Sequence, residues 1–110
     1  MLNMSVTRQI ANVAHLRAAQ FVAKLYSVAS VVIYTTKICA YCGRAKALFA
    51  RKGVAYSEID VSEDDEKRLW LMKTTGQRTV PQIFINEQSV GGFDEVWALE
   101  RQGELDRLLA

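Results

Sequence analysis

The sequence predicts an α/β domain over residues 31–110, with a central four-stranded mixed β-sheet flanked by helices. Apolar, β-branched runs alternate with helical patterns in the order β-α-β-α-β-β-α. A helix joins the first two strands, and strands joined in this way run parallel. The chain turns through Asn86-Glu87 from the third strand into the short last strand.

The first strand, Val31–Thr36, leads almost directly into Cys39-Ala40-Tyr41-Cys42. Apolar residues at helical spacing follow this motif as far as Gly53, a natural helix stop. This order places Cys39 at the N-terminus of a helix. Cys42 lies three residues further on, on the side of the helix that faces inward.

The second strand is predicted at residues 55–61, and Ser62 is the expected N-cap of a helix that ends near Gly76. Four consecutive apolar residues in this helix, Leu69–Met72, cannot all face one core, so we expect part of the run to be exposed.

Pro81 stands before a strand at residues 82–85, where its missing N–H is tolerated. A short strand follows at residues 89–91. A third helix then begins at Phe93-Asp94, with Asp94 as the expected N-cap, and a last helical turn covers residues 104–109.

A Cys-x-x-Cys pair between a strand and a helix is typical of a redox site rather than half of a zinc site. The unpaired N–H groups and the positive end of the helix dipole favour a thiolate at Cys39. An exposed thiol that ionises readily, beside a sheltered partner at Cys42, is what dithiol–disulfide exchange requires.

Composition excludes several other classes of protein. The 110 residues fit one domain of ordinary globular composition. No stretch approaches the roughly 20 uninterrupted apolar residues of a membrane span, and a net charge of +2 does not indicate nucleic-acid binding. Two cysteines and one histidine cannot fill a four-ligand zinc site without carboxylates, so we expect no metal in a monomer.

The charges are unevenly distributed. Residues 1–57 contain eight Lys or Arg and no acid, whereas all twelve acids lie between Glu58 and Asp106. The cysteine motif therefore lies in the basic half, which suits a thiolate and an anionic substrate. A solvated basic helix face explains the same residues equally well.

Residues 1–30 form an N-terminal extension for which we expect an amphipathic helix between about residues 6 and 29. This segment has no acid and contains Arg and Ser, as an organelle transit peptide does. The other interpretation is a variable extension with no targeting role. Its one histidine, His15, has no second candidate ligand nearby.

Three separated segments resemble the glutaredoxins, a family with the thioredoxin-like fold. They are Thr36–Cys42, Gly76–Gln82 and Gly91-Gly92-Phe93-Asp94, and the resemblance covers residues 31–110. It implies a glutathione-dependent thiol–disulfide oxidoreductase, monomeric and cytoplasmic, or mitochondrial if residues 1–30 are a transit peptide. A reductase of the thioredoxin type, served by an NADPH-dependent partner, is a weaker alternative, because the segments Thr79-Val80-Pro81 and Gly91–Asp94 resemble a glutathione site.

The resemblance also implies the roles of the two cysteines. Cys39 matches the nucleophile that attacks glutathione mixed disulfides, helped by the ammonium of Lys37. Cys42 matches the resolving cysteine, which is needed for reducing protein disulfides such as that of ribonucleotide reductase.

The implied glutathione site has three parts. Lys37 and Gln77 match residues that hold the glycine carboxylate, and Tyr41 matches an aromatic wall. Pro81 matches a cis-proline that presents the backbone of Thr79 and Val80 to the tripeptide. The γ-glutamyl end would meet a helix N-terminus at Gly92, Phe93 and Asp94.

One residue departs from the commonest motif of dithiol glutaredoxins, because Ala40 replaces proline. Relatives with a small residue there hold a [2Fe–2S] cluster between two monomers, ligated by the first cysteine of each and by two glutathiones. A carrier or sensor that binds such a cluster through Cys39 is therefore the alternative function.

Overall fold

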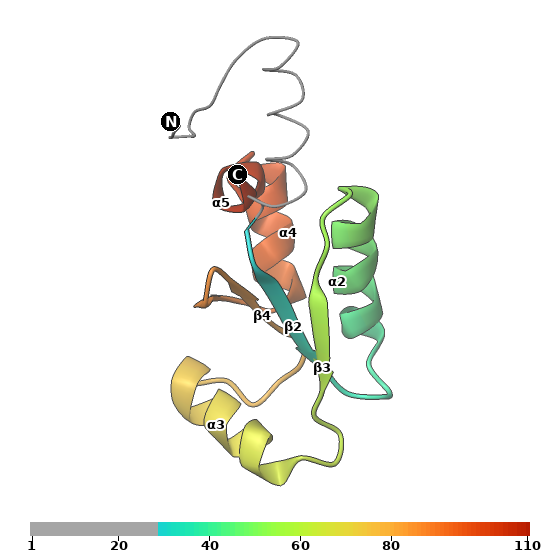
Figure 1. Cartoon of the computed structure of the whole chain (residues 1–110), viewed down its shortest axis with the longest axis vertical. Coiled ribbons are helices and arrows are strands. Elements are labelled where there is room, and N and C mark those ends of the chain that lie inside the picture. Colours follow the sequence, from blue (N-terminus) through green and yellow to red (C-terminus); the bar gives the residue numbers. More distant parts are fainter. Residues whose placement is uncertain (1–28) are drawn as a thin grey trace, which may run out of the picture.

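The computed structural model describes residues 29–110, in which a four-stranded sheet of order β3-β2-β4-β5 is flanked by helices. The predicted α/β fold with a mixed sheet is confirmed (Figure 1). Along the chain the elements are β2 (Val31–Thr35), α2 (Ala40–Arg51), β3 (Ser57–Asp60), α3 (Asp65–Thr75), β4 (Gln82–Ile85), β5 (Gln88–Gly91), α4 (Phe93–Arg101) and α5 (Leu105–Leu109).

Strand β2 lies at the centre of this arrangement. It runs parallel to β3, as the βαβ connection predicts, and antiparallel to β4. In the second pairing Tyr34 lies opposite Gln82, so the end of β2 is next to the start of β4. The segment after β2 and the segment before β4 therefore meet at one edge of the sheet.

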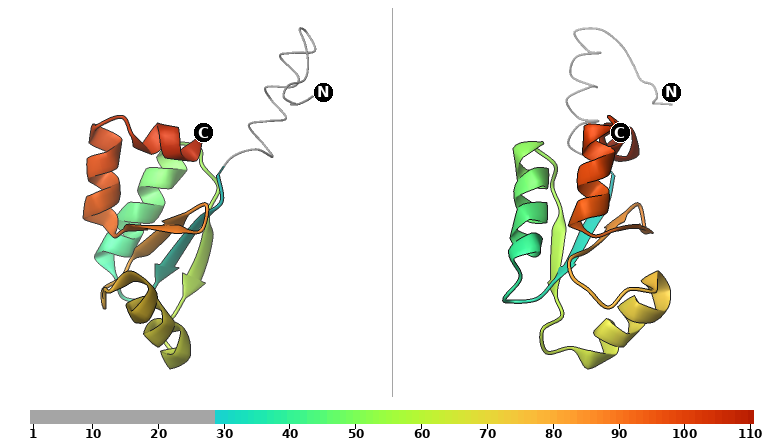
Figure 2. Two further views of the ribbon diagram at one scale, coloured as in Figure 1. Left: turned by 90° about the vertical axis from the view of Figure 1, so that its left-hand side faces the viewer. Right: turned by 180° about the vertical axis from the view of Figure 1, so that it is seen from behind.

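The core has two parts, one on each face of the sheet. Alternate residues of the two central strands, Val31, Ile33, Ile83 and Ile85, pack with buried residues of α2, α4 and α5. The intervening residues pack in a second cluster that includes Leu71 of α3. Figures 1 and 2 accordingly show α2 and α4 side by side, with α3 apart from them at the other end of the molecule.

Two predicted helix caps are wrong. Asp64 caps α3 by accepting the N–H of Lys67 at 2.9 Å, because the helix begins later than Ser62. The N-cap of α4 is Gly92 rather than Asp94. The predicted end of α3 at Gly76 is confirmed by its left-handed conformation, φ 75°.

The apolar run of α3 is partly exposed, as its pattern predicts. Leu71 is buried, whereas Leu69 and Trp70 are 46% and 42% exposed. No helix among residues 29–110 is long and apolar enough to cross a membrane.

The helix expected over residues 6–29 falls outside the described part of the chain except for its last residue. Ala29 is buried in the main core and its N–H donates to Leu109 O at 3.4 Å. Ser30 exchanges hydrogen bonds with Asn86 in the β4–β5 turn, so residues 29 and 30 are part of the folded unit.

Lys52 ties the end of α2 to the C-terminal helices. Its ammonium contacts Glu100 Oε1 at 2.7 Å and Asp106 Oδ1 at 2.8 Å, and its side chain is largely buried. The hydrogen bond to Asp106, followed by that to Glu100, raises the pKa of Lys52 above its ordinary 10.5. This ion pair therefore stays formed at neutral pH.

Replacing Lys52 by Met should lower the free energy of unfolding by about 1–2 kcal/mol, between the values typical of exposed and buried pairs. Because the pKa is raised in the folded state, this stabilisation is complete below the ordinary pKa and disappears as the pH rises through the folded-state value. Urea unfolding at pH 7 and at a series of pH values above 10.5 measures both effects. Arg51→Met, at an exposed position in the same turn, is the control and should change stability by less than about 0.5 kcal/mol. Equal effects of the two substitutions at pH 7 would contradict the assignment.

Candidate active site

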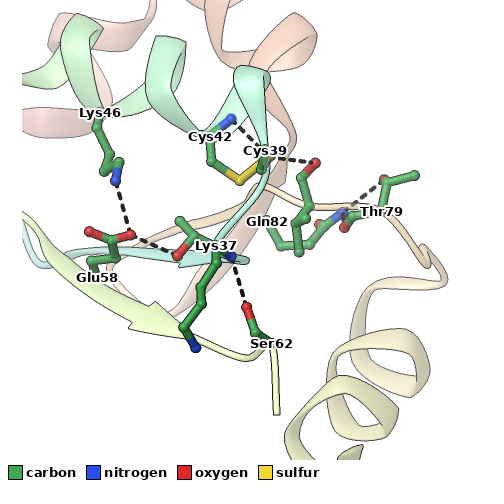
Figure 3. Close-up of a disulfide and its surroundings, with 10 residues drawn as sticks. Lys37, Cys39, Cys42, Lys46, Glu58, Ser62, Thr79 and Gln82 are labelled. Atoms are coloured by element: carbon green, nitrogen blue, oxygen red, sulfur yellow. Dashed lines mark hydrogen bonds and ion pairs between the residues drawn. A yellow bond between two sulfur atoms is a disulfide. The ribbon is translucent and has the colours of Figure 1, made fainter. Parts of the chain in front are cut away.

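The two cysteines lie where β2 gives way to α2. Cys39 is half-buried and is the N-cap residue of the helix, and Cys42 is buried in its first turn. They form a disulfide, with Cα atoms 5.2 Å apart (Figure 3). This is the oxidised state of a dithiol pair, with the more accessible sulfur on Cys39.

The pairing of β2 with β4 brings a distant loop to this sulfur. Cys39 Sγ lies 3.6 Å from the carbonyl oxygen of Val80, which is 41 residues away in the sequence. The Val80–Pro81 peptide bond is cis, as the family resemblance implies. A reduced thiol at Cys39 can donate a hydrogen bond to this carbonyl.

The start of α2 surrounds Cys39 Sγ with positive potential. The backbone N–H of Cys42 donates to the sulfur at 3.0 Å (Figure 3), and the first turn of the helix contains no acidic residue. Both the hydrogen bond and the helix dipole favour a thiolate over a thiol. The prediction that Cys39 lies at a helix N-terminus is confirmed.

Lys37 points away from the disulfide (Figure 3). Its ammonium lies 3.6 Å from Asp60 Oδ2 and 3.8 Å from Glu63 Oε2, and its backbone N–H donates to Ser62 Oγ at 2.8 Å. In this arrangement the dipole and N–H groups of α2, rather than the Lys37 ammonium, supply the positive potential at Cys39.

A groove of about 260 Å³ opens near Cys39. Of the nine residues expected to bind glutathione, eight line this groove and Lys37 does not. The eight come from the start of α2, from the loop before β4 and from the start of α4; they are Tyr41, Gln77, Thr79, Val80, Pro81, Gly92, Phe93 and Asp94.

Backbone groups approach one another closely at the floor of the groove. A Cβ atom on Gly92 would lie 3.2 Å from the carbonyl oxygen of Pro81, tighter than most real contacts. A side chain at position 92 would therefore push the two loops apart. The glycine lets the α4 N-terminus approach the loop before β4.

Glu95 also lines the groove, and sequence reasoning did not find it. Its Oε1 accepts the N–H of Gly92 at 2.8 Å, which is the half of a capping box that Glu supplies; Gly92 has no side chain to supply the other half. A Glu three residues after the N-cap was the available signal. This spacing is counted from the N-cap, so an expected cap at Asp94 leaves Glu95 without that role.

Gln82 is the second missed residue. It is buried, and its Nε2 donates to Thr79 O at 2.9 Å, so it holds the loop that carries Thr79 and Val80 from below (Figure 3). Its Oε1 has no hydrogen-bond partner among the described residues. Nothing in the sequence distinguishes Gln82 from an exposed strand residue.

The aromatic wall extends beyond Tyr41. The Tyr41 ring stacks on Phe93 with centroids 6.1 Å apart, and Phe93 stacks on Trp97 at the same distance. The guanidinium of Arg44 lies 4.9 Å from the centre of the Tyr41 ring, a cation–π contact. These contacts fix the orientation of Tyr41 at the mouth of the groove.

Glu58 links three elements below the cysteine motif. Thr35 at the end of β2 donates to its Oε2 at 2.8 Å, and Lys46 of α2 contacts the same oxygen at 3.0 Å (Figure 3). The Thr35 hydrogen bond, followed by that of Lys46, lowers the pKa of Glu58. The carboxylate thus anchors α2 to β2 and β3 just beyond Cys42.

No cluster of three or more metal-ligating side chains occurs within residues 29–110. The cysteine pair is the centre of chemical reactivity at this edge of the sheet. An accessible sulfur, a sheltered partner sulfur and an adjacent groove can together exchange disulfides with a small thiol.

Comparison with known proteins identifies this arrangement. The glutaredoxin family profile matches residues 31–90. Glutaredoxin 3 of Escherichia coli is 48% identical over 81 residues, 74% of this chain and 98% of the relative. A glutaredoxin of Pseudomonas aeruginosa is 54% identical over 80 residues, 73% of this chain and 95% of the relative.

Solved structures agree with these sequences. The crystal structure of a buckwheat glutaredoxin–glutathione complex superimposes with a TM-score of 0.71 at 34% identity, covering 86% of each chain. The solution structure of a Brucella melitensis glutaredoxin gives 0.69 at 51% identity, covering 76% of this chain and 90% of that one. With its Cys39–Cys42 pair and thioredoxin-like fold, the chain belongs to the glutaredoxin family of glutathione-dependent thiol–disulfide oxidoreductases.

Proposed function

We propose that Cys39 is the nucleophile and Cys42 the resolving thiol of this oxidoreductase. The observation that carries the assignment is the position of Cys39 Sγ, which caps α2 near the groove and lies 3.6 Å from the Val80 carbonyl oxygen. Cys42 is buried behind it and is accessible mainly through Cys39.

Two reaction sequences follow from this arrangement. With a glutathionylated protein, the Cys39 thiolate attacks the glutathione sulfur and the protein leaves as a thiolate. A second glutathione then attacks the resulting mixed disulfide, which releases oxidised glutathione and restores the Cys39 thiolate. With a protein disulfide, Cys39 attacks one sulfur, and Cys42 then displaces the substrate as a dithiol. That exchange leaves the Cys39–Cys42 disulfide, which two glutathione molecules reduce.

The groove supports a specific orientation of glutathione. Its γ-glutamyl carboxylate would meet the N–H groups at the start of α4. Asp94 follows in the first turn of that helix and makes no ion pair or cap within residues 29–110, so its carboxylate is available to the γ-glutamyl ammonium. The Val80 backbone would pair with the peptide as an added strand does.

The glycine carboxylate would lie toward Gln77, which lines the groove. Lys37 can join it only by leaving Asp60 and Glu63. Its side chain is 65% exposed and both pairs are longer than 3.5 Å. Exchanging such exposed pairs for another carboxylate costs little, about 0–1 kcal/mol.

We propose disulfide-containing and glutathionylated proteins as the physiological partners, with ribonucleotide reductase as one candidate and a monomer as the active form. A cytoplasmic location is consistent with the bacterial relatives and with a reducing glutathione pool. The division into an extension at residues 1–30 and a domain at residues 31–110 remains part of the proposal, as does mitochondrial location should the extension be a transit peptide.

The iron–sulfur alternative is less well supported. Ala40 is exposed at the start of α2 and leaves space beside Cys39, but the sulfur that would ligate a [2Fe–2S] cluster is bonded to Cys42. Cys39 cannot ligate a cluster and be bonded to Cys42 at the same time. The short distance between the two cysteines supports disulfide exchange.

The first test is glutathione-dependent reduction of the mixed disulfide of glutathione and 2-mercaptoethanol. Cys39→Ser should lose about three orders of magnitude in activity or more, because it removes the nucleophile. Cys42→Ser should keep activity on this small substrate and lose it on protein disulfides. An active Cys39→Ser variant would overturn the assignment, and an inactive wild type would overturn the proposed enzyme.

Asp94→Asn should raise the KM for glutathione about 5- to 20-fold with little change in kcat, because a charge-assisted contact to the ammonium is lost. Glu66→Asn, at an exposed position on α3 away from the groove, is the control and should leave both constants unchanged. An effect confined to protein stability would show that Asp94 has only a structural role.

Anaerobic reconstitution of the full chain with iron, sulfide and glutathione should give no visible charge-transfer absorption and no dimer. Cys39 and Cys42 are expected to stay reduced without binding a cluster, because the anaerobic mixture contains no oxidant. A stable absorption band with about one cluster per two chains would instead establish the carrier function.

A further inference from the structure

Apart from Lys37, the surface on the other side of Cys39 from the glutathione groove has no role in the reaction described so far. Ile38, the residue directly before the nucleophile, is 96% exposed. A fully exposed isoleucine contributes no burial to the fold, so its apolar side chain is available to a partner.

Two hollows extend from Ile38 along α3. The first, of about 320 Å³, is lined by Thr36, Lys37, Ile38, Ser62 and Arg68. The second, of about 300 Å³, is lined by Asp65, Arg68, Leu69, Met72 and Arg78. Because Arg68 lines both, they form one continuous surface, and neither shares a residue with the glutathione groove. We call Ile38, Arg68, Leu69, Met72 and Arg78 the α3 surface.

The α3 surface is apolar as well as basic. Leu69 is 46% exposed, and Met72 adds a flexible, partly buried side chain. Arg68 and Arg78 form no ion pair within residues 29–110, whereas Lys37 is paired with Asp60 and Glu63. Asp65 is the carboxylate that lines the same hollow. Two unpaired guanidinium groups against one carboxylate favour an acidic ligand that also carries an apolar side chain.

The covalent chemistry fixes where a protein substrate must lie. In the intermediate, a substrate cysteine is bonded to Cys39 at about 2.05 Å. An extended chain advances about 3.3 Å per residue, so the residues flanking that cysteine necessarily pass over the neighbours of Cys39. Ile38 is one of those neighbours, and the α3 surface continues from it.

We propose that the α3 surface binds the segment flanking the reactive cysteine of protein disulfide substrates, and that it selects segments with carboxylates and an apolar side chain. This inference rests on the proposed function, because the segment is held while its cysteine is bonded to Cys39. Ile38 and Leu69 contact the apolar side chain, and Arg68 and Arg78 contact the carboxylates.

The test compares three substrates. Two are peptides closed by a disulfide, one with Asp and Leu beside the reactive cysteine and the other with Lys and Leu. The third is the mixed disulfide of glutathione and 2-mercaptoethanol, which has no flanking segment. The full chain should reduce the acidic peptide with a kcat/KM about 5- to 10-fold higher than the basic one, and 0.5 M salt should remove the difference.

The variants are Arg68→Glu and Ile38→Ser, with Arg51→Glu at the exposed end of α2 as a control of equal charge change. Arg68→Glu should reverse the preference between the two peptides. Ile38→Ser should lower kcat/KM for both peptides about 3- to 5-fold. All three variants should reduce the small mixed disulfide as wild type does, which shows that they are folded and catalytically intact.

The outcomes separate this inference from the proposed function. Wild type that is inactive on the small mixed disulfide would refute the proposed function itself. Wild type that is active on it but shows no preference between the peptides, or an Arg68→Glu variant that behaves like Arg51→Glu, would refute the α3 surface alone. A wild-type dimer in light scattering that Leu69→Ser converts to a monomer would assign the surface to a second copy and overturn the proposal.

Discussion

At Cys39 the chain turns from an extended strand into a helix, and the sulfur of this residue accepts the backbone N–H of Cys42. Helix N-caps are ordinarily oxygen-bearing side chains. Here a sulfur takes that place, so the contact that begins α2 also stabilises negative charge on that sulfur. The structural requirement of the helix and the electronic requirement of the reaction are met by one hydrogen bond.

The sheet supplies the other half of the site. Because β2 and β4 are antiparallel neighbours, the loop after one and the loop before the other lie together, and Val80 faces Cys39. Gly92 then permits α4 to approach the same loop. The groove is thus made from three chain segments whose positions are all set by pairing in the sheet and by packing on one of its faces.

Much of this arrangement could be predicted from the sequence, because its signals are local and strong. Continuous apolar, β-branched runs identify the central strands, and the position of the cysteine motif after β2 identifies the helix N-terminus. The caps of α3 and α4 were less predictable. Asp64 competes with Ser62, and Gly92 with Asp94, within a few residues, and tertiary packing decides between them.

Other features depend on contacts between distant residues and leave no local signal. The hydrogen bond from Gln82 to Thr79 matters because it holds a loop at the active site, yet Gln82 looks like an ordinary strand residue. The direction of the Lys37 side chain follows from carboxylates more than 20 residues away. Lys37 is close to the cysteines in the sequence, but its ion pairs with Asp60 and Glu63 turn its side chain away from them.

The pairing of β2 with β4 has a consequence for how the protein acquires its activity. Cys39 and Cys42 are synthesised well before Val80 and Gly92, and every groove residue except Tyr41 is brought to the thiols by long-range contacts. A nascent chain that ends before β4 therefore carries two thiols without the adjacent groove. The groove forms only when β4 joins the sheet, so it is completed late in synthesis and together with the native topology.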